Sequence, residues 1–304
     1  MSGTGIDSST STAGTSYRLS HNKYLSNLKY GHSAVGASST NELALTVEYC
    51  ILEDNNTAGR ALVAGFDPGG DAGALKYIYT DGAVIRNNWF HGNYGFGIWF
   101  DGHNRNAFVH DNVVENDLKG LLYEISLGGT IIEHNLFKDN GAPSTSANYP
   151  FNSNQVMVSC SPCDGVTAAT GPNITSEIRH NDIDCPAGAA FNTPVILMSF
   201  DRGDIEDGTR NWSVHHNRMW VRAGVARTGL ADNGLRVTWL HPTERIGSVG
   251  ANNHFNFNEY HLYDISAAKT YWEHDTADGN VPGPRTWAQF QTAGQEASGT
   301  RVVI

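Results

Sequence analysis

The sequence predicts an all-β fold, a single-stranded right-handed parallel β-helix (a solenoid) with inserted loops. Three observations predict it. A phrase built around asparagine repeats along the chain, short runs rich in Val, Ile, Phe, Tyr and Trp flank each asparagine, and Gly, Asn and Asp separate those runs. The composition agrees, because 33 Gly and only 17% charged residues suit many turns better than long amphipathic helices.

The repeat is clearest in three segments, which are AVIRNNWFHGN (83–93), AFVHDNVVEN (107–116) and TIIEHNLFKDN (130–140). They share Asn88, Asn112 and Asn135, which are 24 and 23 residues apart. A period near 23 with about three short strands per coil is typical of a parallel β-helix, whose coils stack at the strand spacing of ~4.8 Å. A β-propeller would repeat every ~40–50 residues, and the leucine pattern of a leucine-rich repeat is missing from the sequence.

The same phrase recurs more loosely at five positions, which are Asn22, Asn181, Asn217, Asn258 and, with cysteine in the asparagine slot, Cys50. The longer gaps between these positions predict either loops inserted into some coils or a coil without an asparagine. An asparagine stacked at one corner can bond the turn backbone and the next asparagine, which gives partners to polar groups that burial would leave unpaired. We therefore interpret the asparagines as a structural ladder.

The repeat divides the chain into three parts. Residues 1–17 are expected to be a flexible or capping segment, residues 18–264 the parallel β-helix, and residues 265–304 a C-terminal capping segment. An uncovered first coil would expose an unpaired strand edge. We expect residues 1–17, a second copy or partner chain, or an upstream portion missing from this sequence to cover that edge.

The net charge and the pattern of apolar residues limit which partners are possible. A formal net charge of −11 without Lys/Arg clusters argues against nucleic acid. The negative charge also disfavours binding of acidic polysaccharides by the protein alone. Bound Ca²⁺ would reverse this effect. No apolar run approaches the ~18 residues of a membrane-spanning helix. The first residues do not read as a signal peptide. We expect an extracellular or secreted protein, exported by another route or after loss of a leader, or a virion-surface protein.

Four cysteines leave two interpretations open. Cys160 and Cys163 form half of a zinc site that nothing nearby completes. A local disulfide among Cys160, Cys163 and Cys185 would suit an oxidising compartment, and buried free thiols are the alternative. Cys50 lies in an alternating apolar run and is expected in the core.

Two stretches carry a resemblance to a known family. The run GIWFDGHNRNAFVHDNVVENDLKGLLYEISLGGTIIEHNLFKDN and the tail TWAQFQTAGQEASG resemble the right-handed parallel β-helix (pectate-lyase-like) repeat proteins of bacteria. The resemblance covers roughly residues 18–300. It implies the fold, but the group mixes lyases, hydrolases, epimerases and viral tailspikes. In its lyases carboxylates bind Ca²⁺ and an Arg or Lys abstracts a proton, and the motifs of its polygalacturonase-type hydrolases are missing here.

Two carboxylates are the strongest candidates for chemistry. The strand GIWFD, which ends at Asp101, overlays on GLLYE, which ends at Glu124, one coil later. Alternation along a strand points Trp99 and Asp101 outward in the first, and Leu122 and Glu124 outward in the second. The carboxylates should stack with backbones ~4.8 Å apart. They are expected to bind Ca²⁺, to act as an acid and a base, or to form an ordinary solvated face.

The neighbours of these carboxylates favour a site. His103 and Arg105 follow Asp101 and are candidate catalytic residues, although both also fit a plain loop. Trp99 offers a face on which a sugar ring can stack. Tyr123 is a candidate substrate contact beside Glu124, although alternation points it inward.

A second cluster extends this prediction along the same face. Asp201 and Arg202, in the turn DRGD, are candidate substrate contacts two coils on, and Asp67 would extend the stripe in the other direction. Ordinary Asp/Gly turns explain both equally well.

Two functions follow from these features. The first is a carbohydrate-active enzyme, a polysaccharide lyase or glycoside hydrolase, that takes its substrate in an outer groove near Asp101 and Glu124, with Ca²⁺ as the cofactor if it needs one. The alternative is a non-catalytic structural or glycan-binding β-helix of a virion or cell surface, with homo-oligomer formation. In either case a polysaccharide or glycan is the expected partner, with no insertion into a membrane.

Overall fold

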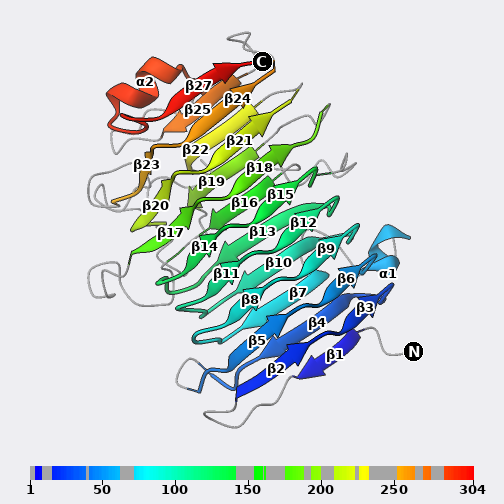
Figure 1. Cartoon of the computed structure of the whole chain (residues 1–304). Coiled ribbons are helices and arrows are strands. Elements are labelled where there is room, and N and C mark those ends of the chain that lie inside the picture. The colour runs from blue at the N-terminus through cyan, green and yellow to red at the C-terminus, as the bar shows by residue number, and fades with distance from the viewer. Residues whose placement is uncertain are drawn as a thin grey trace.

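The arrangement of the chain comes from a computed structural model. It describes residues 4–8, 16–38, 41–61, 72–141, 154–159, 161, 175–187, 193–199, 209–222, 226–232, 252–263, 270–274 and 284–304. The strands stack coil upon coil from one end of the molecule to the other, and each full coil gives one strand to each of three sheets (Figure 1). The predicted solenoid is therefore observed.

The three sheets are parallel except for one pair at the end of the first. Sheet A contains, in spatial order, β1 (Thr4–Ser8), β4 (Tyr30–Val35), β7 (Gly73–Ile78), β10 (Phe96–Asp101), β13 (Lys119–Glu124), β16 (Asn154–Ser159), β19 (Thr193–Ser199), β22 (Ala226–Asp232), β25 (Thr270–His274) and the antiparallel β26 (Pro284–Arg285). Sheet B contains β2 (Ser16–Ser20), β5 (Ala44–Glu48), β8 (Val84–Arg86), β11 (Phe108–His110), β14 (Ile131–Glu133), β17 (Ser176–Arg179), β20 (Trp212–His215) and β23 (His254–Asn256). Sheet C contains β3 (Lys23–Leu25), β6 (Ile51–Glu53), β9 (Trp89–His91), β12 (Val113–Glu115), β15 (Leu136–Lys138), β18 (Asp182–Cys185), β21 (Arg218–Val221), β24 (Glu259–Leu262) and β27 (Thr300–Val303).

The core is the interior of the coils. Alternate residues of the core strands point inward, so that apolar side chains stack into rows, such as Leu75, Ile98, Leu121, Val156 and Val195 in sheet A, all 0% exposed. Each such side chain contributes about 1.5–3 kcal/mol by leaving water. The strands are β-branched and aromatic for this reason, since those side chains fill a row on a pleated surface.

The predicted asparagine ladder lies at the corner between sheets B and C. Its members Asn88, Asn112, Asn135, Asn181, Asn217 and Asn258 follow one another on successive coils. In each step the backbone N–H and the Nδ2 of one asparagine donate to the Oδ1 of the next, at 2.9–3.0 Å. Cys50 occupies the slot before Asn88, as predicted, and its N–H donates to Asn88 Oδ1 at 2.9 Å.

The ladder also explains the long gaps in the sequence between successive ladder residues. Asn181 bonds Asn135 directly although 46 residues separate them, and Asn88 bonds Cys50 across 38 residues. Each long gap between Cys50 and Asn258 is therefore one coil with inserted residues. The inserted helix α1 (Thr57–Arg60) lies in the coil that begins at Cys50.

A second ladder runs along the corner between sheets C and A. It contains Asn27, Asn55, Asn93, Asp117, Asn140 and Gln155. The sequence analysis missed it, because its slot changes residue type from coil to coil. The two ladders together give bonding partners to the turn backbone at both corners.

Strands of the solenoid sheets also lie outside residues 18–264. β1, within residues 1–17, pairs with β4 as the edge of sheet A. At the other end α2 (Trp287–Thr292) places Phe290, 0% exposed, on the core. Glu296 closes the first ladder by accepting from Asn258 Nδ2 at 2.7 Å and from the Tyr260 hydroxyl at 2.8 Å. Burial raises the pKa of Glu296 to about 7.

The cysteines that the structure describes are reduced. Cys50 and Cys185 are buried free thiols, so the thiol alternative holds for Cys185 and the disulfide does not include it. Burial raises the pKa of both thiols. Cys160 and Cys163 lie outside the described residues.

Candidate functional site

The two candidate carboxylates stack on the outer face of sheet A. Asp101 ends β10 and Glu124 ends β13, and the two residues are register partners in neighbouring parallel strands. Alternation sends the preceding Phe100 and Tyr123 into the core, both 0% exposed. The predicted stacking is observed, because one uninterrupted coil of 23 residues separates the two carboxylates.

The carboxylates belong to a network of four side chains. The Nε1–H of Trp99 donates to Glu124 Oε1 at 2.9 Å. Lys76, the register partner of Trp99 on β7, lies 2.9 Å from Asp101 Oδ2 with its Nζ and 3.8 Å from the centre of the Trp99 ring. The indole thus binds a cation on its face and a carboxylate at its edge, which fixes its orientation.

This network is enclosed. Trp99 is 3% and Glu124 5% exposed, whereas the side chain of Asp101 is 22% exposed. The outer face here carries an apolar cluster distinct from the core, formed by Phe96, Trp99, Leu122, Met157, Ile196 and Met198. Charges interact more strongly in such surroundings than in water. Asp101 faces a cation and is the more accessible, and Glu124 faces a neutral donor and is almost closed off.

Arg105 and His103 lie nearby but have other partners. The guanidinium of Arg105 pairs with Glu42 and, through Nε, with Asp81 Oδ2 at 3.2 Å. His103 adopts a left-handed turn conformation with φ 55°, and its ring packs on Tyr79 at 4.5 Å between centroids. Both residues therefore organise the turn after Asp101, as the plain-loop interpretation expects.

Tyr123 does not reach the outer face. Its hydroxyl donates to the carbonyl of Asn104 at 2.9 Å inside the coil, and burial raises its pKa. Its position beside Glu124 in the sequence places it on the opposite side of the strand. A contact between Tyr123 and substrate is therefore not supported by the structure.

The second predicted cluster lies outside the described residues. Asp201 and Arg202 belong to residues 200–208, and Asp67 to residues 62–71. The prediction that they extend the site stays a prediction.

Lys76 is the member of the site that the sequence analysis missed. It lies in GALKYI, the strand one coil before GIWFD. The inserted residues between Cys50 and Asn88 hide this alignment, since they stretch the coil to 38 residues. The sequence does contain this information, because GALKY and GIWFD show the same alternation of apolar residues. The two strands pair in register in the sheet.

The described residues do not favour Ca²⁺ at this site. Among them, no three His, Cys, Asp or Glu side chains are grouped to hold a metal ion. Next to Asp101 the ammonium of Lys76 already supplies positive charge. A hard cation needs about six oxygen ligands, so we derive no step through Ca²⁺.

The fold and the site together define a parallel β-helix protein with an acidic and aromatic site on one outer face. The chain matches the family model for the right-handed β-helix region over residues 2–184, more than half of its length, and belongs to that family. No curated protein and no solved structure gives a significant match.

The helices bear on the membrane prediction. No helix within the described parts of the chain is long and apolar enough to cross a membrane.

Proposed function

We propose that this protein is a carbohydrate-active β-helix enzyme, a retaining glycoside hydrolase of an extracellular polysaccharide, with Asp101 and Glu124 as its two carboxyl groups. The observation that carries the proposal is their pairing in register on one outer face. Stacked strands place the backbones ~4.8 Å apart. Retaining glycosidases hold their carboxyl groups about 5–5.5 Å apart, whereas inverting enzymes need roughly 6.5–9.5 Å.

The surroundings of the two groups suggest their roles. We assign Asp101, ion-paired with Lys76 and more exposed, as the nucleophile, and Glu124, enclosed and hydrogen-bonded to Trp99, as the acid and base. Asp101 attacks the anomeric carbon while the glycosidic C–O bond breaks and Glu124 gives its proton to the leaving oxygen. Glu124 then takes a proton from water, whose oxygen attacks the same carbon and releases Asp101.

A lyase has less support. Proton abstraction beside a uronate requires a free basic side chain and a cation on the carboxylate. Arg105 is paired with Glu42 and Asp81, and Lys76 with Asp101.

Activity on a panel of aryl glycosides and polysaccharides tests the proposal. On any substrate that the wild type cleaves, Asp101→Asn and Glu124→Gln are expected to lower kcat/KM by about 10²–10⁴-fold or more. A 2-fluoro glycoside should trap a covalent adduct at Asp101, and NMR of the first product should show retained anomeric configuration. Glu115→Gln is the matched control, since Glu115 accepts from Trp89 in the same way on sheet C. Full activity in both variants would exclude the assignment.

One observation favours a second candidate, a non-catalytic structural or glycan-binding β-helix of a cell or virion surface. The four polar side chains of the site satisfy one another, and Glu124 is almost inaccessible. A stable trimer or fibre in sedimentation experiments, without turnover of any glycan, would support this candidate.

A further inference from the structure

A column of imidazoles lies on the outside of the corner that holds the first asparagine ladder. The residue before each ladder position adopts a left-handed conformation with φ between 52° and 58°, which turns its side chain out at the corner of sheets B and C. On three successive coils this residue is His134, His180 or His216. Their rings stack with centroids 5.5 Å and 5.3 Å apart and planes 9° and 30° from parallel. Phe257 extends the stack at 4.9 Å. We call these three histidines the imidazole column.

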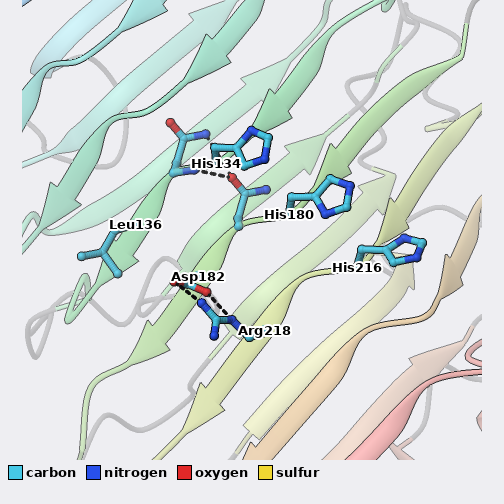
Figure 2. Close-up of a pocket in the computed structure, with 8 residues that line it drawn as sticks. His134, Leu136, His180, Asp182, His216 and Arg218 are labelled. Atoms are coloured by element: carbon cyan, nitrogen blue, oxygen red, sulfur yellow. Dashed lines mark hydrogen bonds and ion pairs between the residues drawn. The ribbon is translucent and has the colours of Figure 1, made fainter.

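The column borders a hollow in the surface. The hollow has a volume of about 450 Å³ and is lined by the three histidines, the ladder residues Asn135 and Asn181, Leu136, Asp182 and Arg218. Figure 2 shows the three imidazoles side by side above the Asp182–Arg218 pair, in which Nε and Nη2 of Arg218 reach the two carboxylate oxygens at 2.8 Å each. All three imidazoles are exposed, so a ligand can enter.

The stacking decides which chemistry the column offers. Each ring covers the face of its neighbour, so a sugar ring cannot stack on a face inside the column. The ring edges remain, although Nδ1 of His216 lies 2.8 Å from Nδ1 of His215. A protonated imidazole donates from both nitrogens. Within the described residues no group of three or more metal-ligating side chains is present, which leaves out a metal site. Edge donors repeated every 5.3–5.5 Å suit a row of anionic oxygens, since charge-assisted hydrogen bonds are the strong ones.

The charged groups that face the column are mostly paired with each other. They are Glu133, Glu177, Arg179 and His215 on sheet B, Asp182 and Arg218 on sheet C, and Asp111, which takes the column position one coil before His134. Arg179 pairs with Glu133 and Glu177, and Asp111 with His110 at 2.7 Å. These groups include four carboxylates and two guanidiniums, so the surroundings of the hollow are negative and positive charge there has to come from the imidazoles. Burial, followed by the charges of His216, His134 and Arg179, lowers the pKa of His180. His180 is therefore uncharged at neutral pH, and a proton added on acidification makes it cationic.

We propose that the imidazole column is a binding site for an acidic polysaccharide, whose carboxylate or sulfate groups lie along the helix axis, one near each coil, and that it binds below neutral pH. The net charge of −11 opposes such a ligand at neutral pH. Acid adds positive charge to histidine side chains, and the column gathers three of them at one hollow. The Asp182–Arg218 pair offers acceptors as well as donors, which suits a hydroxyl-bearing chain better than a polyphosphate. The inference does not depend on the proposed activity, because the site uses sheets B and C and not sheet A.

Calorimetric titration with a defined oligogalacturonate and its methyl-esterified form tests the proposal. All proteins carry Asp101→Asn to prevent turnover. The test variant replaces His134, His180 and His216 by Asn, which the backbone accepts because Asn87 holds the same position at φ 52°. His21→Asn is the matched control, since His21 has the same backbone position at φ 58° and stacks on Tyr49 outside the hollow.

The parent protein should bind the acidic oligosaccharide at least about tenfold more tightly at about pH 5.5 than at about pH 7.5. The triple variant should lose that difference, and His21→Asn should keep it. Imidazole NMR signals of the column should shift on binding. Equal affinity of the triple variant at the lower pH, equal binding of the neutral ester, or preference for an oligonucleotide would each overturn the proposal. Circular dichroism and urea unfolding verify that each variant is folded.

Discussion

Trp89 and Glu115 on sheet C form the same bond as Trp99 and Glu124 on sheet A. In both pairs an indole N–H on one coil donates to a carboxylate on the next coil at 2.9 Å, two positions beyond the register partner of the tryptophan. Trp89 is 38% exposed and Trp99 is 3% exposed. Stacking alone therefore produces this pair, and the pair by itself does not mark a functional site.

The surroundings of the two tryptophan–glutamate pairs differ. Glu124 lies beside an apolar cluster, with Asp101 directly before it on the neighbouring strand and a lysine held on the indole. Glu115 has His91 and Lys138 as its register partners. A second carboxylate and exclusion of water distinguish the sheet A pair, and these are the properties that acid–base chemistry requires.

Removing the indole N–H from each pair should destabilise the protein by different amounts. Trp99→Phe leaves an enclosed carboxylate without that donor and a partly empty space, so we expect a loss of about 2–4 kcal/mol in the free energy of unfolding. Any glycosidase activity should fall about tenfold or more, because Glu124 loses its orientation. Trp89→Phe should cost about 0.5 kcal/mol or less. Urea unfolding and kcat/KM measure both, and equal losses in the two variants would contradict the distinction.

The fold followed from the sequence because three successive positions of the first ladder hold one residue type at a near-constant spacing of 24 and 23 residues. Asn88, Asn112 and Asn135 make the coil length visible, and the register of Asp101 with Glu124 follows from it. The second ladder escaped because its slots hold asparagine, aspartate and glutamine, which share an acceptor oxygen rather than a residue name.

Side-chain partners were harder to predict, because they come from coils that insertions shift out of alignment. Arg105 was a candidate catalytic residue beside Asp101, but it pairs with Glu42 and Asp81 from elsewhere in the chain. The column of His134, His180 and His216 was also missed, because the residue before each ladder asparagine varies along the chain.

Asp117 extends the comparison to a carboxyl group with no exposure at all. In the second ladder Asn93 and Asn140 each donate from Nδ2 to a core carbonyl, those of Leu52 and Val114. Asp117 has Oδ2 in place of that donor, and within the described residues this buried oxygen has no hydrogen-bond partner. Burial raises the pKa of Asp117 well above its ordinary value of 3.8.

Asp117→Asn should therefore stabilise the protein at neutral pH. Because the folded-state pKa lies above the unfolded value, the folded chain binds the proton more tightly, and stability falls as the pH rises above about 3.8. Asparagine restores the donor and removes this loss, so we expect a gain of about 1–3 kcal/mol at neutral pH that disappears below the ordinary pKa. Urea unfolding across this range measures it. Asp111→Asn, at an exposed carboxylate on the same coil, should show no such gain.

The smallest change in the free energy of unfolding should come from replacing the paired cation on each face, Lys76 on sheet A and Arg218 on sheet C. Lys76→Met removes the partner of Asp101 where the lysine side chain is 12% exposed, and we expect a cost of about 1 kcal/mol. Arg218→Met removes the partner of Asp182 on sheet C, where the arginine side chain is 58% exposed, and should cost about 0.5 kcal/mol or less. High salt should weaken the Arg218 pair more than the Lys76 pair, because exposed charges are screened and enclosed ones are not. Unfolding measured at low and high ionic strength gives both values. A Lys76 pair as salt-sensitive as the Arg218 pair would mean that water reaches the sheet A carboxylates freely, and the enclosure that separates Glu124 from Glu115 would then have no energetic consequence.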